Sequence, residues 1–204
     1  MIEEREIGGT CLNRGCIPTK ALLKISEALY TIGKAKEFGI DSSISSIDAN
    51  VCTVRKDRVV KSLRMGLEYL LSKDDIEVLN GKGRIEDAGR ITVETQDGNI
   101  GVKYAKLIIT TGSEPLMPNI PGIRLENVIT SDEALDLRSI PESIAIIGAG
   151  AIGMEFATLF NSLGAKVTVP WCKSRGAGRF DTSPPCTCRS GNGSLRRCSG
   201  KGCS

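Results

Sequence analysis

The chain of 204 residues contains no histidine. It therefore has no imidazole to act as a catalytic base or to ligate a metal. It also has no run of about eighteen uninterrupted apolar residues, the minimum for a membrane-spanning helix. The N-terminal segment MIEEREIGG is acidic and lacks the apolar core of a signal peptide. We therefore expect a protein of the reducing cytoplasm, with no membrane partner.

The charge is unevenly distributed. Residues 1–170 carry 20 Lys and Arg against 23 Asp and Glu, whereas residues 171–204 carry seven basic residues and one acid, Asp181. The formal net charge of +3 therefore originates in the tail. A mildly acidic body argues against nucleic acid as a partner.

The tail is poor in aliphatic side chains, and Leu195 is its only aliphatic residue larger than alanine. Such a segment cannot bury enough apolar surface to offset the entropy of ordering it, so we expect residues 170–204 to be disordered. Because the aliphatic pattern stops abruptly after Val169, we hypothesise that this tail is read out of frame and that Met1 is an internal start.

A competing interpretation makes the tail a metal site. It contains five of the eight cysteines, namely Cys172, Cys186, Cys188, Cys198 and Cys203. Their spacing matches no standard zinc pattern, so we predict no metal in this protein.

Apolar residues recur at helical spacing in residues 21–40 and 54–71, and Gly39 supplies a stop for the first of these helices. A shorter helix is expected around residues 131–137.

Short β-like runs are expected at residues 76–85, 90–95 and 100–112, with a turn at Asp97–Gly98. A clear β-turn-α-β unit then spans residues 143–169.

Two cysteines, Cys11 and Cys16, lie in the string GGTCLNRGCIPTK. Cys16 is expected at the start of a helix, where Pro18 is tolerated and where the helix dipole favours the reactive thiolate. Two thiols this close can open and close a disulfide in exchange chemistry. Spacing alone leaves two unpaired thiols as an equal alternative.

This string closely resembles the redox-active disulfide segment of the pyridine-nucleotide-disulfide oxidoreductases, and the resemblance covers about residues 1–169. It implies that Cys11 is the interchange thiol, which attacks the disulfide substrate, and that Cys16 lies beside a flavin. Lys20, one helical turn after Cys16, is then the lysine near flavin N5. Without the motif, Lys20 would be interpreted as a solvated helix lysine.

The resemblance also implies contacts with FAD elsewhere in the chain. Glu3 falls at the end of an expected strand, where the family has an acid that binds the adenosine ribose; an exposed charge is the competing interpretation. The segment LIITTGSEP resembles a later flavin-contacting strand and turn, although a strand ending in Thr-Gly is common. The implied FAD-binding residues are Glu3, Gly9, Thr10, Lys20, Thr111 and Gly112.

A second motif, Gly148-x-Gly150-x-x-Gly153, directly follows an expected strand and opens a helix. This placement is what a dinucleotide pyrophosphate needs, although a plain strand-helix turn is the competing interpretation. In the family it is the nicotinamide-dinucleotide site, and Glu155 matches the glutamate that pairs with the helix lysine, here Lys20. Ala151 stands where glutathione reductases have a tyrosine, which favours the dihydrolipoamide dehydrogenases within the family.

The implied fold is α/β: an incomplete FAD-binding Rossmann-like domain (1–138), followed by the start of an NAD-binding Rossmann domain (139–169). The family's first strand with its own glycine turn has no counterpart here, nor has the domain that carries a His–Glu base and forms a homodimer. Pro170 and Trp171 stand near the place of the ribose-binding acid, so NADP is not excluded as the nicotinamide cofactor.

The parental reaction implied is oxidation of dihydrolipoamide by NAD through FAD and a Cys11–Cys16 disulfide. The partners would then be lipoyl domains of 2-oxoacid dehydrogenase or glycine-cleavage complexes. The alternatives are a mercuric or other disulfide reductase of the same family and a non-catalytic truncated product. The missing segments favour the last of these for the chain as it stands.

Overall fold

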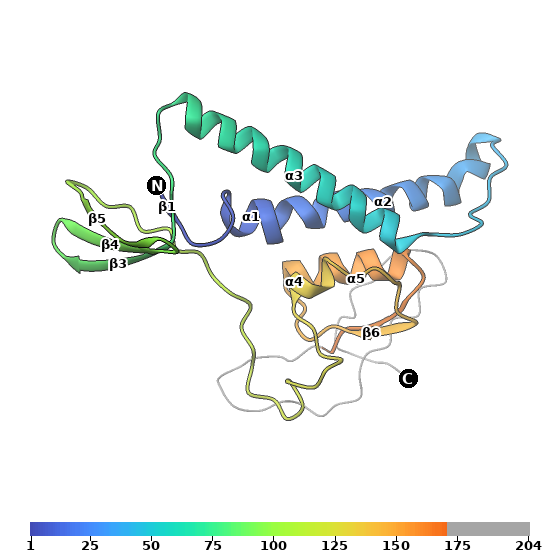
Figure 1. Ribbon diagram of the computed structural model, residues 1–204. Coiled ribbons are helices and arrows are strands. Elements are labelled where there is room, and N and C mark those ends of the chain that lie inside the picture. The colour runs from blue at the N-terminus through green and yellow to red at the C-terminus, as the bar shows by residue number, and fades with distance from the viewer. Residues whose placement is uncertain (171–204) are drawn as a thin grey trace. The chain divides into compact units, whose positions relative to one another are not determined.

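The computed structural model describes residues 1–170 (Figure 1). Its contacts divide the chain into two compact units, Met1–Pro18 with Lys56–Ala134, and Thr19–Arg55 with the chain from Leu135 onward. The expected domain boundaries, 1–138 and 139–169, remain a prediction. The expected disordered tail and the alternative metal site of its cysteines lie outside the described residues, apart from Pro170.

The first unit contains a three-stranded antiparallel sheet in the order β3 (Lys82–Asp87), β4 (Arg90–Thr95) and β5 (Gly98–Lys103). Two-residue turns join the strands, and each is followed or completed by a glycine in the left-handed region, Gly89 at φ 109° and Gly98 at φ 124°. The β-like runs are thus confirmed for β3 and β4. The second turn occupies residues 96–97, one residue earlier than expected.

The central strand β4 provides the core of this sheet. Ile91 and Val93 are buried, while the residues between and beside them are more exposed. Such alternation is typical of an antiparallel sheet with one covered face.

A second, much smaller pairing in the same unit is parallel. Strand β1 (Ile2–Glu3) pairs with β2 (Leu79–Asn80), and the Gly81 N–H donates to the Glu3 carbonyl at 2.8 Å. Glu3 is therefore the last residue of its strand, as the sequence predicted.

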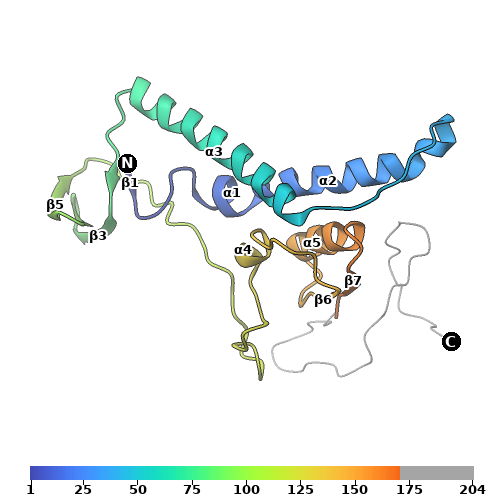
Figure 2. The ribbon, with the colours of Figure 1, turned by 45° about the vertical axis from the view of Figure 1, so that its right-hand side comes forward.

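The second unit contains the β-turn-α-β arrangement that the sequence predicts (Figure 2). Strands β6 (Ser143–Ala145) and β7 (Lys166–Thr168) are parallel neighbours, and helix α5 (Ala151–Ser162) connects them. The buried face of α5 consists of Phe156, Ala157, Leu159 and Phe160. Gly164, at φ 98°, follows the helix end.

The two long helices begin earlier than the apolar periodicity indicates. Helix α2 spans Cys16–Lys34 and continues into a 3-10 turn at Ala35–Phe38, which ends at Gly39 with φ 77°. Helix α3 spans Ala49–Lys73, because the Asp48 carboxylate accepts the Val51 N–H at 3.1 Å and caps it. The short helix α4 is limited to Ser131–Ala134.

One local expectation is wrong, and one helix was not anticipated. Residues 9–14 form a short helix, α1 (Gly9–Arg14), which the sequence did not suggest. Residues 104–112, expected to continue a β-like run into the flavin-contacting strand, form no strand. Among the described residues no neighbouring strand offers them a ladder, so Ile108 and Ile109 stay exposed.

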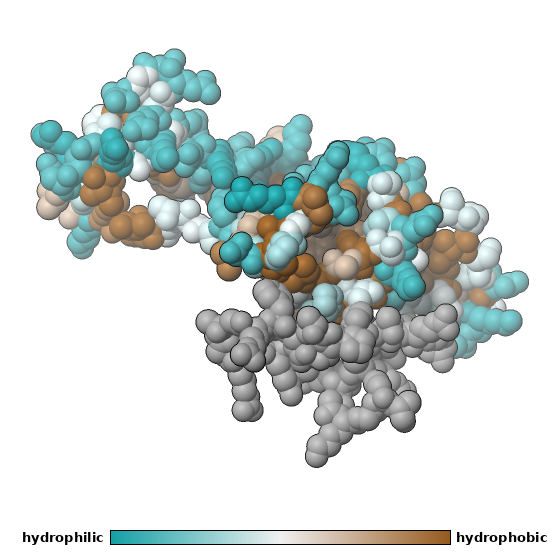
Figure 3. Space-filling model, turned by 90° about the horizontal axis from the view of Figure 1, so that it is seen from below, coloured by the Kyte–Doolittle hydropathy of each residue, from teal (hydrophilic) through white to brown (hydrophobic). Residues whose placement is uncertain are grey.

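Large apolar side chains reach the surface elsewhere too, and hydrophobic areas are visible on the face in Figure 3. None of the helices between residues 1 and 170 has the length and apolarity needed to cross a bilayer.

Candidate functional site

The cysteine segment contains a close approach of its own backbone. Cys11 lies in α1 and Cys16 is the first residue of α2, and both side chains are exposed. Between them, a Cβ on Gly15 would lie 3.0 Å from the Thr10 carbonyl oxygen and 3.2 Å from Cys11 Cα. The residue before Cys16 thus lies close to the backbone of Cys11, and a side chain at this position would be crowded.

Gly15 is a site residue that the sequence interpretation missed. The signal was present, because a glycine directly before a helix-starting cysteine is typical of close backbone approach. What could not be read from the sequence was which backbone it approaches.

Cys52 is the third cysteine of the described chain and differs from the other two. Burial, followed by the nearby Asp48 carboxylate, raises the pKa of its thiol. A raised pKa reduces the thiolate fraction at neutral pH, so Cys52 is expected to be less reactive, consistent with a bystander thiol.

The first unit brings together two residues predicted to bind FAD, although 101 residues separate them in sequence. A Cβ on Gly112 would lie 3.7 Å from Thr10 Oγ1. An ion pair of 2.7 Å between Arg5 and Glu114 links the same two segments. Gly9, at φ 62°, opens α1 directly before Thr10.

Two other predicted FAD residues, Glu3 and Thr111, lie in the same unit. Glu3 ends β1, and its Oε1 accepts the Arg5 N–H at 2.9 Å, which leaves the carboxylate further capacity to accept. Thr111 lies in the irregular segment before Gly112 and is exposed.

The glycine-rich turn has the geometry that its motif predicts. Gly148 has φ 109°, and a Cβ on Gly153 would collide with the Gly148 carbonyl oxygen. Gly150 is the N-cap of α5, and the first turn of this helix contains no acidic residue. Its amide groups can therefore receive an anion such as a pyrophosphate.

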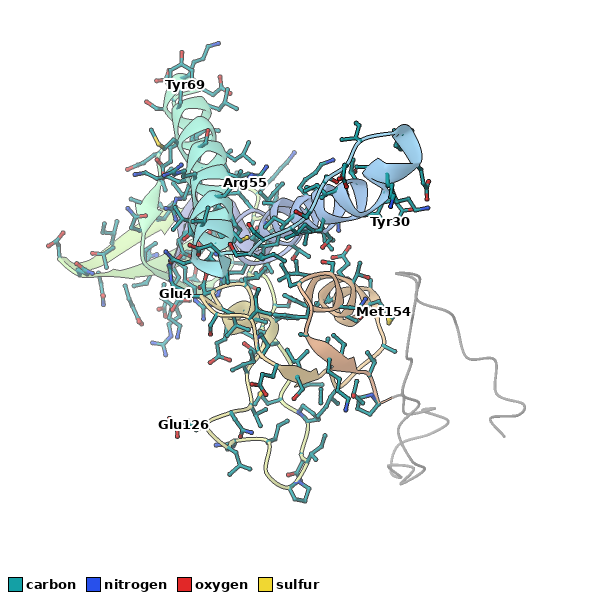
Figure 4. The ribbon with its side chains drawn as sticks, turned by 90° about the vertical axis from the view of Figure 1, so that its right-hand side faces the viewer. Glu4, Tyr30, Arg55, Tyr69, Glu126 and Met154 are labelled. Carbon is teal, nitrogen blue, oxygen red and sulfur yellow. The ribbon has the colours of Figure 1, made fainter. Side chains whose placement is uncertain are left out.

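Lys20 and Glu155 form a direct ion pair from α2 to α5 within the second unit. Two further contacts position α2 there. The Arg55 guanidinium on α3 (Figure 4) donates to the Ala21 carbonyl at 3.0 Å, and the Ser162 hydroxyl of α5 lies 2.6 Å from that of Ser26.

A depression of about 320 Å³ in the first unit contains none of the predicted site residues. It is lined by residues 78–80, 95 and 97–100, beside the β4–β5 turn. Between residues 1 and 170, no three Cys, Asp or Glu side chains gather as metal ligands would.

The sequence model of the pyridine nucleotide-disulphide oxidoreductases matches residues 1–181. The chain belongs to this family. The match runs past Val169, where we expected the resemblance to end.

Among its relatives, the dihydrolipoyl dehydrogenase of Acholeplasma laidlawii is 41% identical over 174 residues, covering 83% of this chain and 51% of that protein. The dihydrolipoyl dehydrogenase of Chlamydia muridarum is 43% identical over 171 residues, covering 83% and 37%. The chain thus spans between about a third and a half of the length of these relatives.

A solved structure is also similar: the Cu(II) complex of the HOCl-induced flavoprotein disulfide reductase RclA from Escherichia coli. It matches with a TM-score of 0.70 and 31% identity over 82% of this chain and 35% of that one. The fold is therefore that of the FAD-binding, Rossmann-like region of flavoprotein disulfide reductases, as the sequence predicted.

Membership implies the use of a flavin and a pyridine nucleotide, and the residues fit both groups. The backbone beside Gly9, Thr10 and Gly112 is exposed, so a flavin nucleotide can approach it closely. The exposed Ile147 and Ile152 flank the glycine turn of α5 and can cover a second dinucleotide.

Proposed function

We propose that the chain carries the disulfide-exchange centre of a dihydrolipoyl dehydrogenase, whose full reaction passes electrons from dihydrolipoamide to NAD. The observation that supports this most is the close approach within the cysteine segment, where Gly15, directly before Cys16, lies against the backbone of Cys11. It is supported by relatives of that name at about 40% identity.

In the proposed exchange, Cys11 bonds to one sulfur of dihydrolipoamide and Cys16 leaves as a thiol. The second thiol of the substrate then displaces Cys11. The substrate becomes a cyclic disulfide, and the Cys11–Cys16 disulfide becomes two thiols, so two electrons and two protons have moved. When bound, FAD would supply the acceptor for this electron pair and NAD would supply the final hydride acceptor.

Other residues would bind and orient the cofactors. In the first unit, Glu3, Gly9, Thr10, Thr111 and Gly112 would contact FAD. In the second, the amide groups at the start of α5 would bind the NAD pyrophosphate at Gly148, Gly150 and Gly153. Glu155 would hold the ammonium group of Lys20 in place, as their ion pair supports.

The partners of the whole enzyme would be lipoyl domains and a second copy of the enzyme. These proposals come from the dehydrogenase relatives and concern the longer protein, of which this chain matches a part.

The roles of the two thiols can be tested in the chain as it exists. With Cys16→Ser, lipoamide should form a mixed disulfide at Cys11, whereas with Cys11→Ser it should form at least fivefold less at Cys16. Trypsin cuts after Arg5, Arg14 and Lys20, so each cysteine falls in its own peptide and mass spectrometry resolves both from the tail cysteines. Equal adducts in the two variants would contradict the assignment.

A second candidate is another disulfide reductase of the family, and the similarity to the reductase RclA favours it. The same Cys16→Ser variant separates the two candidates. The rate of mixed-disulfide formation at Cys11 is measured with lipoamide and with glutathione disulfide. Each rate is divided by the rate in denaturing urea, which corrects for the intrinsic reactivity of the reagent. A corrected preference for lipoamide supports the dehydrogenase, and one for glutathione disulfide supports the alternative.

A further inference from the structure

The helix that carries Cys11 is too short to be stable alone. Helix α1 has six residues, starts at Gly8 with φ 104°, and has no side-chain cap at that end. Short helices in water do not recover the entropic cost of nucleation. Side-chain contacts must therefore help to hold the backbone of Cys11 in place.

The side chain of Asn13 provides such contacts. Its Nδ2 group lies 3.0 Å from the carbonyl oxygens of both Ile7 and Gly9, and 3.4 Å from that of Glu6. The two protons of the amide thus serve two short hydrogen bonds, with the third carbonyl at the margin. Glu6 and Ile7 belong to the turn before α1, and Gly9 is its first residue, so the Asn13 side chain links the helix to the segment that precedes it.

The other end of the same amide indicates why an asparagine is there. Asn13 Oδ1 is buried and has no hydrogen-bond partner among residues 1–170. A buried acceptor without a partner destabilises the fold, and a leucine of similar shape would avoid that cost. The amide is thus useful here as a hydrogen-bond donor. Only its nitrogen can donate to the three carbonyl oxygens, so the nitrogen faces them and the oxygen does not.

We call these hydrogen bonds of Asn13 the clamp, and they lie between the two thiols in sequence. Asn13 lies two residues after Cys11 and three before Cys16. Gly15, directly before Cys16, lies against the Cys11 backbone. A disulfide needs its two Cα atoms within about 4.4–6.8 Å, so a shift of α1 weakens closure.

We propose that Asn13 is a positioning residue that holds Cys11 where it can close a disulfide with Cys16. This inference rests on the proposed function, because it presumes that the two cysteines exchange. In the closing reaction, the two thiols give two electrons and two protons to glutathione disulfide, which becomes two glutathione molecules.

The test is the equilibrium constant of that reaction for the full chain in glutathione buffers. Samples are quenched with acid, alkylated and digested, and the disulfide-linked peptides 6–14 and 15–20 are quantified. Two variants remove the donor. Asn13→Leu has a similar shape and adds no charge, whereas Asn13→Asp places a carboxylate opposite the carbonyl oxygens. Asn119→Asp, at an exposed loop position, is the control for added charge.

We expect the equilibrium constant to fall at least tenfold in both Asn13 variants, which corresponds to about 30 mV. In denaturing urea, all chains should agree within twofold, because the clamp is absent there. A merely structural role would lower the unfolding midpoint and leave the constant measured on folded protein unchanged.

The outcomes separate the two claims. If Asn13→Leu matches the wild type within twofold, the positioning role is wrong, whether or not Asn13→Asp differs through its charge. If the wild-type chain forms no Cys11–Cys16 disulfide at any glutathione ratio, the proposed function fails first.

Discussion

The two parallel strand pairs of this protein differ in how their partners meet. Strands β6 and β7 pair over three residues, and the helix between them, α5, buries four side chains in the same unit. Strands β1 and β2 pair over two residues, and the chain between them runs from residue 4 to residue 78. Parallel strands need a crossover connection, and only in the β6–β7 pair is that connection a single short helix.

This difference matters for function because both pairs bear predicted cofactor residues at their strand ends. The glycine turn follows β6, and Glu3 ends β1. The first arrangement follows from one contiguous stretch of sequence, whereas the second depends on contacts made at long sequence separation.

The largest effect is expected in the core of the β6–α5–β7 unit. Phe160 is 3% exposed and stacks on Phe156 at 6.1 Å between ring centroids. Phe160→Ala should lower the free energy of unfolding by about 3–5 kcal/mol. Ile2→Ala, in the half-buried β1, should cost only about 1 kcal/mol, as measured by urea unfolding followed by circular dichroism. Equal losses would remove the contrast between the two pairs.

The next effect concerns the glycine turn. Gly153→Ala should cost about 1–3 kcal/mol, because the new Cβ meets the Gly148 carbonyl oxygen. Gly33→Ala, in α2 with nothing near its added Cβ, should instead stabilise the chain by about 0.5–1 kcal/mol. In thermal denaturation, Gly153→Ala should therefore lower the melting temperature and Gly33→Ala should raise it. A neutral Gly153→Ala would show that the turn accommodates a side chain.

A smaller effect is expected where α5 contacts α2. Ser162→Ala should cost about 1–2 kcal/mol, because it leaves the buried Ser26 hydroxyl without this partner. Ser26→Ala should cost less, since Ser162 keeps the Leu159 carbonyl as an acceptor at 2.7 Å. A double-mutant cycle in urea measures the coupling, and additive losses would argue against a direct hydrogen bond.

The smallest effect is a pH dependence at Cys52. Burial and Asp48 raise the pKa of this thiol, so its contribution to stability is complete below the ordinary thiol pKa and is lost as pH rises through the raised value. Asp48→Asn keeps a capping side chain but removes the charge, so alkylation of Cys52 should begin at lower pH in that variant. An unchanged pH profile would leave burial as the sole cause.

Local patterns were sufficient for much of this protein. The strand, glycine turn, helix and strand of residues 143–168 were predicted because period, turn chemistry and helix stop all lie within one contiguous stretch. Likewise, the helix start at Cys16 followed from Pro18 and its neighbours. The contact of Lys20 with Glu155 was implied by the family resemblance and not by spacing, since they lie 135 positions apart in sequence.

Other features required the tertiary structure. The β-branched residues at 108–111 favour a strand, yet no strand forms, because strand propensity acts only where a neighbour offers a ladder. Asn13 and Gly15 gave no periodic signal, and their importance appears only when the carbonyls of residues 7 and 9 and the backbone of Cys11 surround them. The sequence by itself determined which residues can do the chemistry. The tertiary structure decided which of them meet, because hydrogen bonds and close backbone approaches depend on distances that no local pattern specifies.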